Sequence, residues 1–516
     1  MTKSAVKSAN PYMPLWEHVP DGEPKVFEYE GEKRVYVYGS HDTLRTEYCG
    51  DDYVCWSAPV SDLTDWTCHG SVFSYGGSVL FAPDAVRKGD WFYLYAAPEH
   101  GSKVVVARSR TPWGPFTDPV ETDLGFDPAV LVDDDGRAYA YWGFCKACCG
   151  ELNEDMATIR EGTYRENYIG HCRAPWAEDE AHMDFTYGFF EASSIRRIRG
   201  RYVLVYSKMY NEPVPELGVR TDNNGFLSYA VSDRPLDGYV YMGDISFNGG
   251  EILRRGPEGE MTYPWGNNHG GLCEVNGQWY IFYHRQTGVN EFSRQAMMEP
   301  VEIEEDAQGR LLIGRIIRDE QGRAVASGPV EMTSQGPHTG GIDARQIISA
   351  GYACHISPQP EHRAQDAWEE PQERTDDEHG GVNGSDSAGS GPRAAGVRRP
   401  THAYVSVVYD TEAISAPVVR ITDGTAVGLR YLAFGEKSPQ TVTIRARAEA
   451  EMTVTLHAGR IENAPAARLM LPAGAQEWMT VSAPLTAALS GRRAVYFVFH
   501  CDDPEAEAQF DTFTFD

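Results

Sequence analysis

The stretch "GRYVLVYS", residues 200–207, decides the fold, because close variants of it recur along the chain. In each copy a glycine suited to a tight turn precedes a short run of aromatic and β-branched residues, which is typical of the second strand of a β-hairpin. Another strand-like run stands ahead of each glycine, so each copy predicts an antiparallel hairpin. The other copies are "GEKRVYVYGS" from Gly31, "GDWFYLYAA" from Gly89, "GRAYAYWG" from Gly136 and "GQWYIFYH" from Gly277.

A third run and a turn follow several of these hairpins, as in "KVVVARSRTPWGPF" and "FLSYAVSDRPLDGY". Units of three or four strands that occur five times favour the radial repetition of a β-propeller over a sandwich. We therefore expect a five-bladed propeller over residues 1–325. The irregular spacing indicates long inserted loops, such as 144–188 and 209–225, and long loops on a rigid scaffold often carry function.

The pattern changes from about residue 326. Runs such as "AYVSVVY", "QTVTIRARA", "AVYFVFH" and "FDTFTFD" alternate with turns and predict an antiparallel β-sandwich over residues 326–516. Residues 358–400 are rich in Pro, Gly, Ser and charge and hold few large apolar side chains. Such a segment cannot bury enough surface to order itself, so we expect a mobile insertion there.

The charge balance excludes some partners. The 516 residues hold 46 Lys and Arg against 75 Asp and Glu, a formal charge of −29. This charge repels phosphate backbones and anionic membranes, so neither nucleic acid nor a membrane is an expected partner. No segment resembles a signal peptide, and no run approaches the ~18 apolar residues of a membrane span, so we expect a cytoplasmic protein.

The ten cysteines show no disulfide framework. Cys145, Cys148 and Cys149 in "CKACCG" are the one cluster that suggests a metal. Zinc sites normally take a second pair of ligands from another loop, and the chain has no matching pair. We therefore expect buried or loop thiols and no metal site at this cluster.

The repeat also predicts a site. The first strand of each propeller blade lines the central axis, so equivalent positions of the blades converge on one cavity. Glu191 lies nine residues before its hairpin glycine, and each of the other blades carries a polar or aromatic residue eight to ten residues before its own. These residues are Asp21, Phe81, Asp127 and His269.

Converging carboxyl groups are typical of glycoside hydrolysis, which needs one protonated and one ionised carboxyl across the scissile bond. Glu191 lies in "FFEAS", where apolar neighbours raise its pKa, and is the predicted general acid. Asp21 in the polar "PDGEP" suits an ionised base. Asp127 in "FDPAV" is then a third charge that keeps the acid protonated.

With these motifs in order, the chain resembles glycoside hydrolase family 43 over about residues 10–325, through "NPYMPLWEHVPDGEPKVF", "FAPD", "FDPAVLVDDDGRAYAYWG", "FFEAS" and "NNHGG". The resemblance implies an inverting mechanism in which Asp21 is the base, Asp127 the pKa modulator and Glu191 the acid. His269 matches a histidine near the bottom of the family's pocket that often contacts water or a cation. Arg294 in "FSRQAM" resembles a substrate-facing arginine.

Two departures concern specificity. Ala192, Ser193 and Ser194 follow the acid where many members carry Gly-Pro, and Phe81 stands where many carry Trp or Tyr.

The sandwich is similar to a family 6 carbohydrate-binding module, a jelly roll, through "DGTAVGLRYLAF" and "FDTFTFD". Trp478 is its candidate stacking residue, although a core tryptophan is the more frequent use of such a position.

The resemblance implies an exo-acting glycosidase that releases a terminal pentose, as an α-L-arabinofuranosidase or a β-xylosidase, from arabinose- or xylose-containing oligosaccharides. No cofactor is required, and a Ca²⁺ or another cation near His269 is the metal that the resemblance allows. An endo-acting arabinanase and a glycan-binding propeller without catalysis are the alternatives. The three carboxyl groups count against the second, because binding alone needs no acid, base and modulator.

Overall fold

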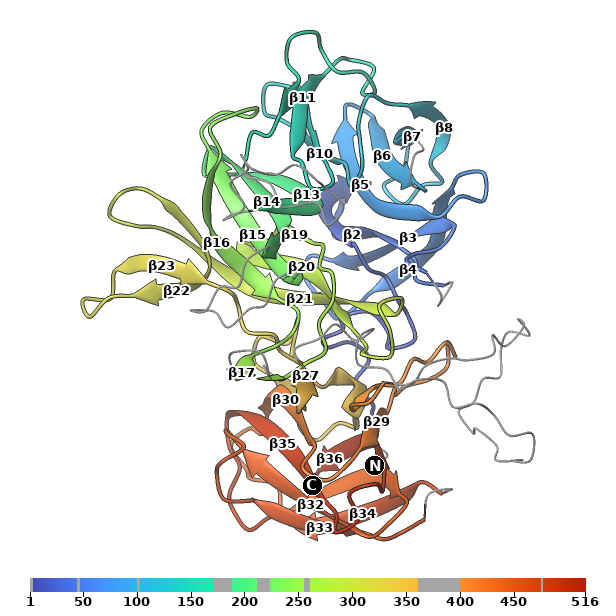
Figure 1. Ribbon diagram of the computed structural model, residues 1–516, viewed down its shortest axis with the longest axis vertical. Helices are drawn as coiled ribbons and strands as arrows, with labels where there is room; N and C mark the ends of the chain where they lie inside the picture. Colours follow the sequence, from blue (N-terminus) through green and yellow to red (C-terminus); the bar gives the residue numbers. More distant parts are fainter. Residues whose placement is uncertain are drawn as a thin grey trace, which may run out of the picture.

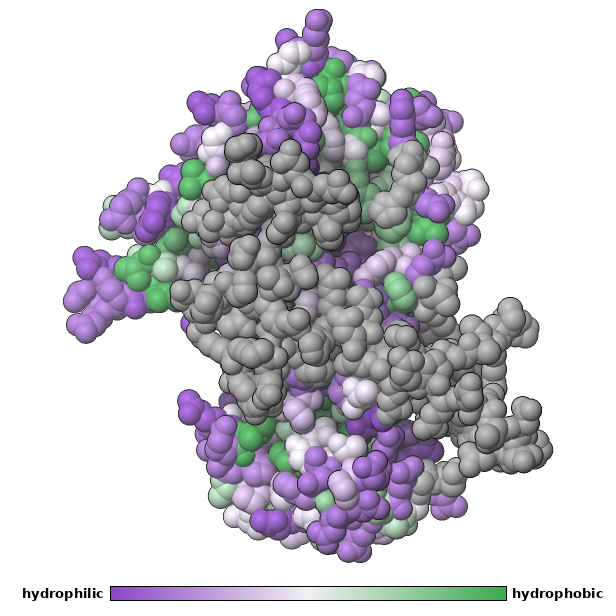
Figure 2. Space-filling model, viewed as in Figure 1, coloured by the Kyte–Doolittle hydropathy of each residue, from purple (hydrophilic) through white to green (hydrophobic). Residues whose placement is uncertain are grey.

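The computed structural model describes residues 3–43, 47–99, 103–169, 188–210, 223–254, 260–360, 400–474 and 477–516. Within these ranges the regular secondary structure is almost entirely β-strand, and the one helix is the short 3-10 turn η1 (Ala350–Tyr352). No helix of these ranges is long and apolar enough to cross a membrane. Figure 1 shows a propeller at the top and a smaller sandwich at the bottom. On the face shown in Figure 2 the described surface is mostly hydrophilic.

Five antiparallel sheets, each built from strands in chain order, form the blades. Blade one holds β1 (Glu23–Tyr29), β2 (Glu32–Ser40), β3 (Asp52–Pro59) and β4 (Thr67–Ser74). Blade two holds β5 (Leu80–Lys88), β6 (Trp91–Pro98), β7 (Val105–Ser109) and β8 (Thr117–Glu121). Blade three holds β9 (Ala129–Val132), β10 (Ala138–Trp142), β11 (Cys148–Leu152) and β12 (Arg165–Glu166). Blade four holds β13 (Phe189–Ile198), β14 (Arg201–Tyr210), β15 (Asn223–Ser232) and β16 (Val240–Phe247). Blade five holds β19 (Gly271–Val275), β20 (Gln278–Gln286), β21 (Arg294–Glu305), β22 (Leu311–Arg318) and β23 (Ala324–Gly328).

The first strands close into a ring. β1 contacts β5, β5 contacts β9, β9 contacts β13, β13 contacts β19, and β19 returns to β1. This closure leaves no free edge at the axis. It confirms the predicted five-bladed propeller and places the five first strands around one axis.

The repeated glycine has a conformational role. All five hairpin glycines have φ between 61° and 84°, a region that suits residues without a Cβ. A Cβ added at any of them would meet nothing within 4 Å, so the turn geometry and not a lack of space requires glycine. In blades one, four and five the residue before the glycine is also left-handed, as in a type I′ turn. These residues are Glu30, Arg199 and Asn276.

The expected loop at 144–188 is wrong in part, because β11 and β12 of blade three lie within it. The small residues of "CCGEL" lack the β-branched run that marks the other strands, so the sequence signal is weak there. The expected loop at 209–225 is shortened by β14, which ends at Tyr210, and β15, which begins at Asn223. The residues between these two strands and residues 170–187 lie outside the described ranges.

Two facing sheets build the sandwich, as expected for a jelly roll. One sheet holds β24 (Ile342–Asp343), β30 (Ala426–Ala433), β35 (Arg492–His500), β32 (Met452–Ala458) and β33 (Ala467–Leu471), with β26 (His355–Ser357) on β30. The other holds β28 (Tyr404–Val405), β29 (Val418–Ile421), β36 (Ala508–Phe515), β31 (Thr441–Ala448) and β34 (Met479–Pro484), with β25 (Ile348–Ser349) on β36. Phe497 packs between them, its ring 4.9 Å from those of Phe510 and Phe513.

The two parts share an interface. A small sheet of β17 (Ile252–Arg254), β18 (Glu260–Met261) and β27 (Gln359–Pro360) joins them, and the buried Arg285 of β20 donates to the Ala353 carbonyl at 2.7 Å. At the other end of the chain, Lys3 donates to Thr514 at 2.8 Å, so residues expected in the propeller lie against the sandwich. Most of the insertion predicted at 358–400 lies outside the described residues.

Candidate active site

The structure brings most of the predicted site residues together at one end of the axis. Arg294 of β21 contacts Asp21 before β1, and His269 before β19 lies 3.8 Å from Asp127 before β9. Asp127 in turn accepts a hydrogen bond from the backbone next to Glu191 of β13. The ring of first strands therefore delivers three carboxyl groups and an imidazole to one place, and β21 adds the Arg294 guanidinium.

Asp21 is buried, with 6% of its surface exposed, and has φ +55°. Aspartate tolerates this left-handed region better than most residues, which lets the chain turn sharply into β1. Arg294 donates to its Oδ1 and Oδ2 at 3.1 and 3.4 Å. Burial alone would raise the pKa of Asp21, but the Arg294 guanidinium lowers it below its usual range. Asp21 is therefore ionised across the weakly acidic and neutral range.

Arg294 is itself held by Asp42. Its Nε and Nη2 donate to the two carboxylate oxygens of Asp42 at 3.0 and 2.9 Å, a bidentate pair that fixes the plane of the guanidinium. Nη2 also lies 3.4 Å from the Cys49 thiol. Burial raises the pKa of Cys49, so this thiol is neutral. The buried arginine thus balances two carboxylates and turns a fixed edge toward Asp21.

Asp127 has the same backbone conformation as Asp21, with φ +52° and 3% exposure, but different neighbours. Its Oδ2 accepts from the Ala192 N–H at 3.0 Å. Burial and the negative charges of Glu191 and Asp21 raise the pKa of Asp127 well above its usual range. The carboxyl cluster therefore retains a proton at pH values where isolated carboxyls have lost theirs.

Glu191 sits on a bulged part of β13. It pairs with Ser207 of β14, and the register shifts on both sides of it, between Phe189 and Glu191 and between Glu191 and Ser194. Bulges next to active sites re-aim side chains, and Ala192 with φ +68° continues the distortion. Glu191 is half-buried, so it is the most exposed of the three carboxyls.

Aromatic rings line one side of this region. Phe81 of β5 is half-buried, and its ring lies 5.4 Å from that of Phe126, the residue before Asp127. Phe126 lies 5.7 Å from Phe144, which lies 5.0 Å from Phe190, the residue before Glu191. The structure therefore connects Phe81 to the carboxyl cluster through an arc of rings. Flat apolar faces of this kind suit the C–H face of a sugar ring.

Two buried histidines stay neutral. Burial lowers the pKa of His284 to about 4 and also lowers the pKa of His269. His284 accepts from the Asp21 N–H through Nδ1 at 3.3 Å and donates through Nε2 to the Asn267 carbonyl at 2.8 Å, which fixes its tautomer. His284 thereby holds the backbone of Asp21 in place.

The expected cation near His269 finds few ligands. Calcium takes six to eight oxygen ligands, about 2.3–2.6 Å away. Among the described residues, no group of three or more His, Cys, Asp or Glu side chains could hold a metal. The residues near His269 therefore do not fit a Ca²⁺ held by protein groups alone, and we derive no chemical step from one.

Sequence reasoning missed Asp42, Cys49 and His284. Asp42 and Cys49 lie beyond the second strand of blade one, and His284 lies in β20. The repeat relates only residues at the starts of the first strands, so residues on other strands carried no signal of a shared site. The polar character of Asp42 inside "YGSHDT" and of His284 inside "YIFYHRQ" was the available hint, since buried polar side chains need partners.

The cysteine cluster lies apart from this chemistry. Cys145, Cys148 and Cys149 are all buried. Cys145 packs with Phe190 and Met209, and Cys149 packs in the core between blades three and four. In the described part of the chain they act as small apolar side chains.

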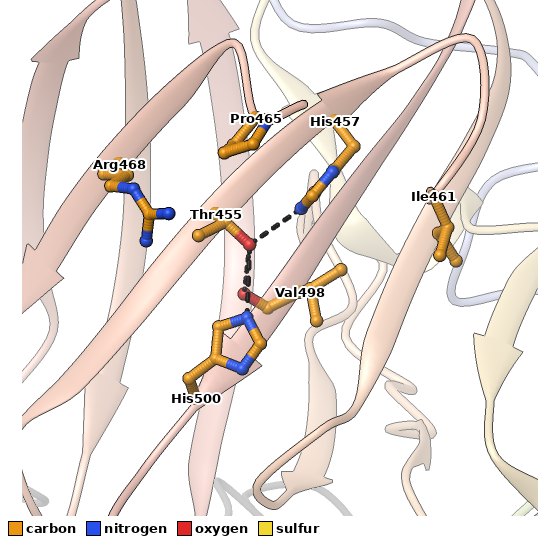
Figure 3. A pocket seen from close by; sticks show the side chains of 7 residues that line it. All are labelled: Thr455, His457, Ile461, Pro465, Arg468, Val498 and His500. Carbon is orange, nitrogen blue, oxygen red and sulfur yellow. Dashed lines mark hydrogen bonds between the residues drawn. The ribbon is translucent and has the colours of Figure 1, made fainter. Parts of the chain in front are cut away.

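The sandwich carries a pocket of about 480 Å³ on the outer face of β32, β33 and β35 (Figure 3). Thr455 lies at its centre and contacts Nε2 of both His457 and His500, at 2.9 and 3.3 Å. Arg468, Ile461, Pro465 and Val498 complete the lining.

The predicted stacking residue Trp478 lies elsewhere and is half-buried. Arg445 and Arg447 lie over its ring, each 4.8 Å from the centroid, so cation–π contacts cover it.

Comparison with known proteins finds relatives with similar sequences. The chain is 36% identical over 380 residues to a xylosidase/arabinosidase of Thermoclostridium stercorarium, covering 67% of this chain and 72% of that protein. It is 29% identical over 314 residues to an arabinoxylan arabinofuranohydrolase of Paenibacillus polymyxa, covering 53% of this chain and 46% of that protein.

Among solved structures, a glycoside hydrolase family 43 arabinoxylan arabinofuranohydrolase from Bacillus subtilis aligns over 100% of this chain and 99% of its own, with a TM-score of 0.45 and 19% identity. A family 43 enzyme from Xanthomonas citri complexed with xylose aligns over 58% of this chain and 91% of its own, with a TM-score of 0.44 and 23% identity. The profile of glycosyl hydrolases family 43 matches residues 22–308, which run from β1 of blade one through β21 of blade five. This chain belongs to glycosyl hydrolases family 43 and is a glycoside hydrolase.

Proposed function

We propose that this glycoside hydrolase is an inverting, exo-acting enzyme that releases a terminal pentose, α-L-arabinofuranose or β-D-xylose, from arabinose- or xylose-containing oligosaccharides. One observation carries the proposal: two carboxyl groups at equivalent positions of the repeat have pKa values displaced in opposite directions. Arg294 lowers the pKa of Asp21, whereas burial and the charge of Glu191 raise the pKa of Asp127. Carboxyls pushed apart in this way divide into an ionised base and a side that holds a proton.

The chemistry follows from that division. Glu191, the most exposed of the three, donates its proton to the glycosidic oxygen as the bond to the anomeric carbon breaks. Asp21 accepts a proton from a water molecule, whose oxygen attacks the anomeric carbon from the opposite face. The leaving alcohol carries the proton from Glu191, and the new sugar hydroxyl carries the water oxygen. Asp127 repels negative charge on Glu191 and fixes the Ala192 backbone beside it.

The relatives support the substrate class. The similar curated proteins bear the names xylosidase/arabinosidase and arabinoxylan arabinofuranohydrolase, both of which refer to pentose-containing glycans. The arc from Phe81 to Phe190 offers apolar faces beside the carboxyls, where a sugar ring can stack.

Hydrolysis of aryl α-L-arabinofuranosides, aryl β-D-xylosides and short arabino-xylo-oligosaccharides, followed by proton NMR of the first-formed sugar, tests the proposal. We expect a free pentose with inverted anomeric configuration. A retained anomer would instead mean that a carboxylate attacks the sugar directly, and internal cleavage without free pentose would favour the endo-acting alternative.

A further inference from the structure

A second charged cluster lies on the propeller axis below the carboxyls. We call Glu23, Lys25, Asp84 and Arg196 the axial ion cluster. Glu23 and Asp84 are 2% and 1% exposed, and Lys25 and Arg196 are largely buried. Lys25 Nζ bridges Glu23 Oε1 at 3.1 Å and Asp84 Oδ1 at 2.8 Å, while Arg196 Nη2 lies 2.7 Å from Glu23 Oε1. Two acids and two bases thus neutralise each other without help from solvent.

The cluster touches every blade. Glu23 and Lys25 belong to β1, Asp84 to β5 and Arg196 to β13. Asp84 Oδ2 accepts from the Val130 N–H of β9 at 2.5 Å, and Arg196 Nε donates to the Leu272 carbonyl of β19 at 2.6 Å. Each contact lies two to five residues after the site residue of the same blade, so the cluster forms a layer just beneath the site. The pairs, given as site residue and contact, are Asp21 with Glu23, Phe81 with Asp84, Asp127 with Val130, Glu191 with Ser194 and Arg196, and His269 with Leu272.

Regular strand pairing starts at this layer. In β13 the register is shifted up to Ser194 and is regular from Ser194 onward. In β5 it is shifted between Phe81 and Asp84 and is regular from Asp84 onward. Glu191 and Phe81 therefore stand where the pairing register is irregular, ahead of the regular part of their strands. Their positions depend on where the regular part is anchored.

The strongest tie runs between the strands of the base and the acid. Glu23, two residues after Asp21, accepts from Arg196 and also from Ser194 Oγ at 3.2 Å, and both donors follow Glu191 on β13. Arg196 further donates to the Pro24 carbonyl of β1 at 2.8 Å. An inverting reaction needs a carboxyl separation of roughly 6.5–9.5 Å, so that water fits between sugar and base. A tie between β1 and β13 acts directly on that separation.

Burial of these charges needs a reason other than stability. A buried ion pair often stabilises a fold no more than well-packed apolar residues of similar volume would. What ion pairs and charge-assisted hydrogen bonds add is direction, because they hold partners at a fixed distance and angle. Burial would raise the pKa of Glu23, but Arg196 and Lys25 lower it to about 2, so its pairs persist throughout the working pH range.

We propose that the axial ion cluster is a positioning device for catalysis, in which the tie from Glu23 to Ser194 and Arg196 sets the separation of Asp21 and Glu191. This inference rests on the proposed roles of those two carboxyls. Glu23, Lys25, Asp84 and Arg196 touch no substrate and act through the strands that carry the site.

Arg196→Met is the direct test, because methionine keeps the apolar stem and removes the tie. Arg430→Met is the matched control, since Arg430 is a buried sandwich arginine paired with Glu331 at 3.1 Å. Both variants are assayed well below their Tm, with circular dichroism to confirm folding. We expect kcat of Arg196→Met on an arabino- or xylo-disaccharide to fall 10- to 100-fold with KM within about threefold, as for misplaced catalytic groups. Arg430→Met should keep kcat within about twofold of the parent under the same comparison.

Gly271→Ala tests the same device without removing a charge. A Cβ at Gly271 would lie 2.5 Å from Ser194 Oγ and 2.6 Å from Glu23 Oε2, so both side chains must move and the tie between them is displaced. We expect kcat to fall at least about fivefold, again with little change in KM. This variant also decides the matter if Arg196→Met does not fold. If either variant, Gly271→Ala or Arg196→Met, is folded and has the same kcat as the parent, the proposal is overturned.

Crystal structures of the parent and Gly271→Ala provide a readout that is independent of activity. The distance between the carboxyl carbons of Asp21 and Glu191 should change in the variant, and an unchanged distance would contradict the positioning role. Failure of the proposed function has a different signature, because Glu191→Gln would then retain disaccharide hydrolysis. The two outcomes are therefore distinguishable.

Discussion

Asp21 at the start of blade one and Asp127 at the start of blade three occupy equivalent positions of the repeat, yet their electrostatics are opposite. Both are buried and left-handed, with φ +55° and +52°. Asp21 faces Arg294, which lowers its pKa, whereas Asp127 faces Glu191 and accepts a backbone N–H, and burial raises its pKa. The repeat thus delivers like residues to one place, and the burial and charges around each of them decide which is ionised.

Removing the carboxyls of base and acid should have the largest effect. We expect Asp21→Asn to lower kcat about 10²–10⁴-fold on every substrate, because water activation is needed whatever the leaving group. Glu191→Gln should show a similar loss on an unactivated disaccharide and a much smaller one on an aryl glycoside with a good leaving group. Steady-state kinetics on both substrates check this contrast. Equal losses in Glu191→Gln on the two substrates would remove the acid role.

Replacing Arg294 should make Asp21 more like Asp127. In Arg294→Met the pKa of Asp21 loses the charge that lowers it, so the base becomes protonated at higher pH. The acidic limb of the kcat/KM profile should therefore move to higher pH, by about one unit or more. Removing one partner of a buried ion pair costs about 3–5 kcal/mol of stability, so thermal unfolding should be followed in parallel. Arg294→Lys keeps the charge, so the acidic limb of its kcat/KM profile should lie close to that of the parent. An acidic limb at the parent's pH in Arg294→Met would refute the electrostatic role of Arg294.

Asp127→Asn tests the other side of the comparison. Without the repulsion between Asp127 and Glu191, the remaining acid loses its proton at lower pH, and the alkaline limb of kcat/KM should move down by about one unit. We also expect about a tenfold loss of rate, since the Ala192 backbone loses its charged acceptor. A pH–rate profile separates the two effects. A uniform loss of rate with an unmoved alkaline limb would make Asp127 a substrate-positioning residue.

Cys49→Ala should have the smallest effect. The thiol lies 3.7 Å from Asp21 Oδ2, but burial raises its pKa and it carries no charge. We expect activity within about threefold of the parent and an acidic limb moved by less than about 0.3 unit. A shift comparable to that of Arg294→Met would mean that the thiol, and not the guanidinium, controls Asp21.

The propeller was predictable because its signals are local and repeated. Turn glycines, the aromatic and β-branched second strands and the start of each first strand are all readable within about ten residues. The weak strand β11 escaped, because "CCGEL" carries little strand propensity and depends on pairing with β10. Trp478 shows a similar limit, since only the folded sandwich brings Arg445 and Arg447 onto its ring.

The sequence by itself determined that Asp21, Asp127, Glu191 and His269 meet on one axis, because a repeated hairpin places equivalent residues alike. Only the tertiary structure decided their charges and their spacing. Asp42 and Arg294 lie 252 residues apart in the chain, and Glu23 and Ser194 lie 171 apart. No local pattern connects such pairs, since electrostatic partners are selected by distance in space, and distance in space exists only once the blades have closed.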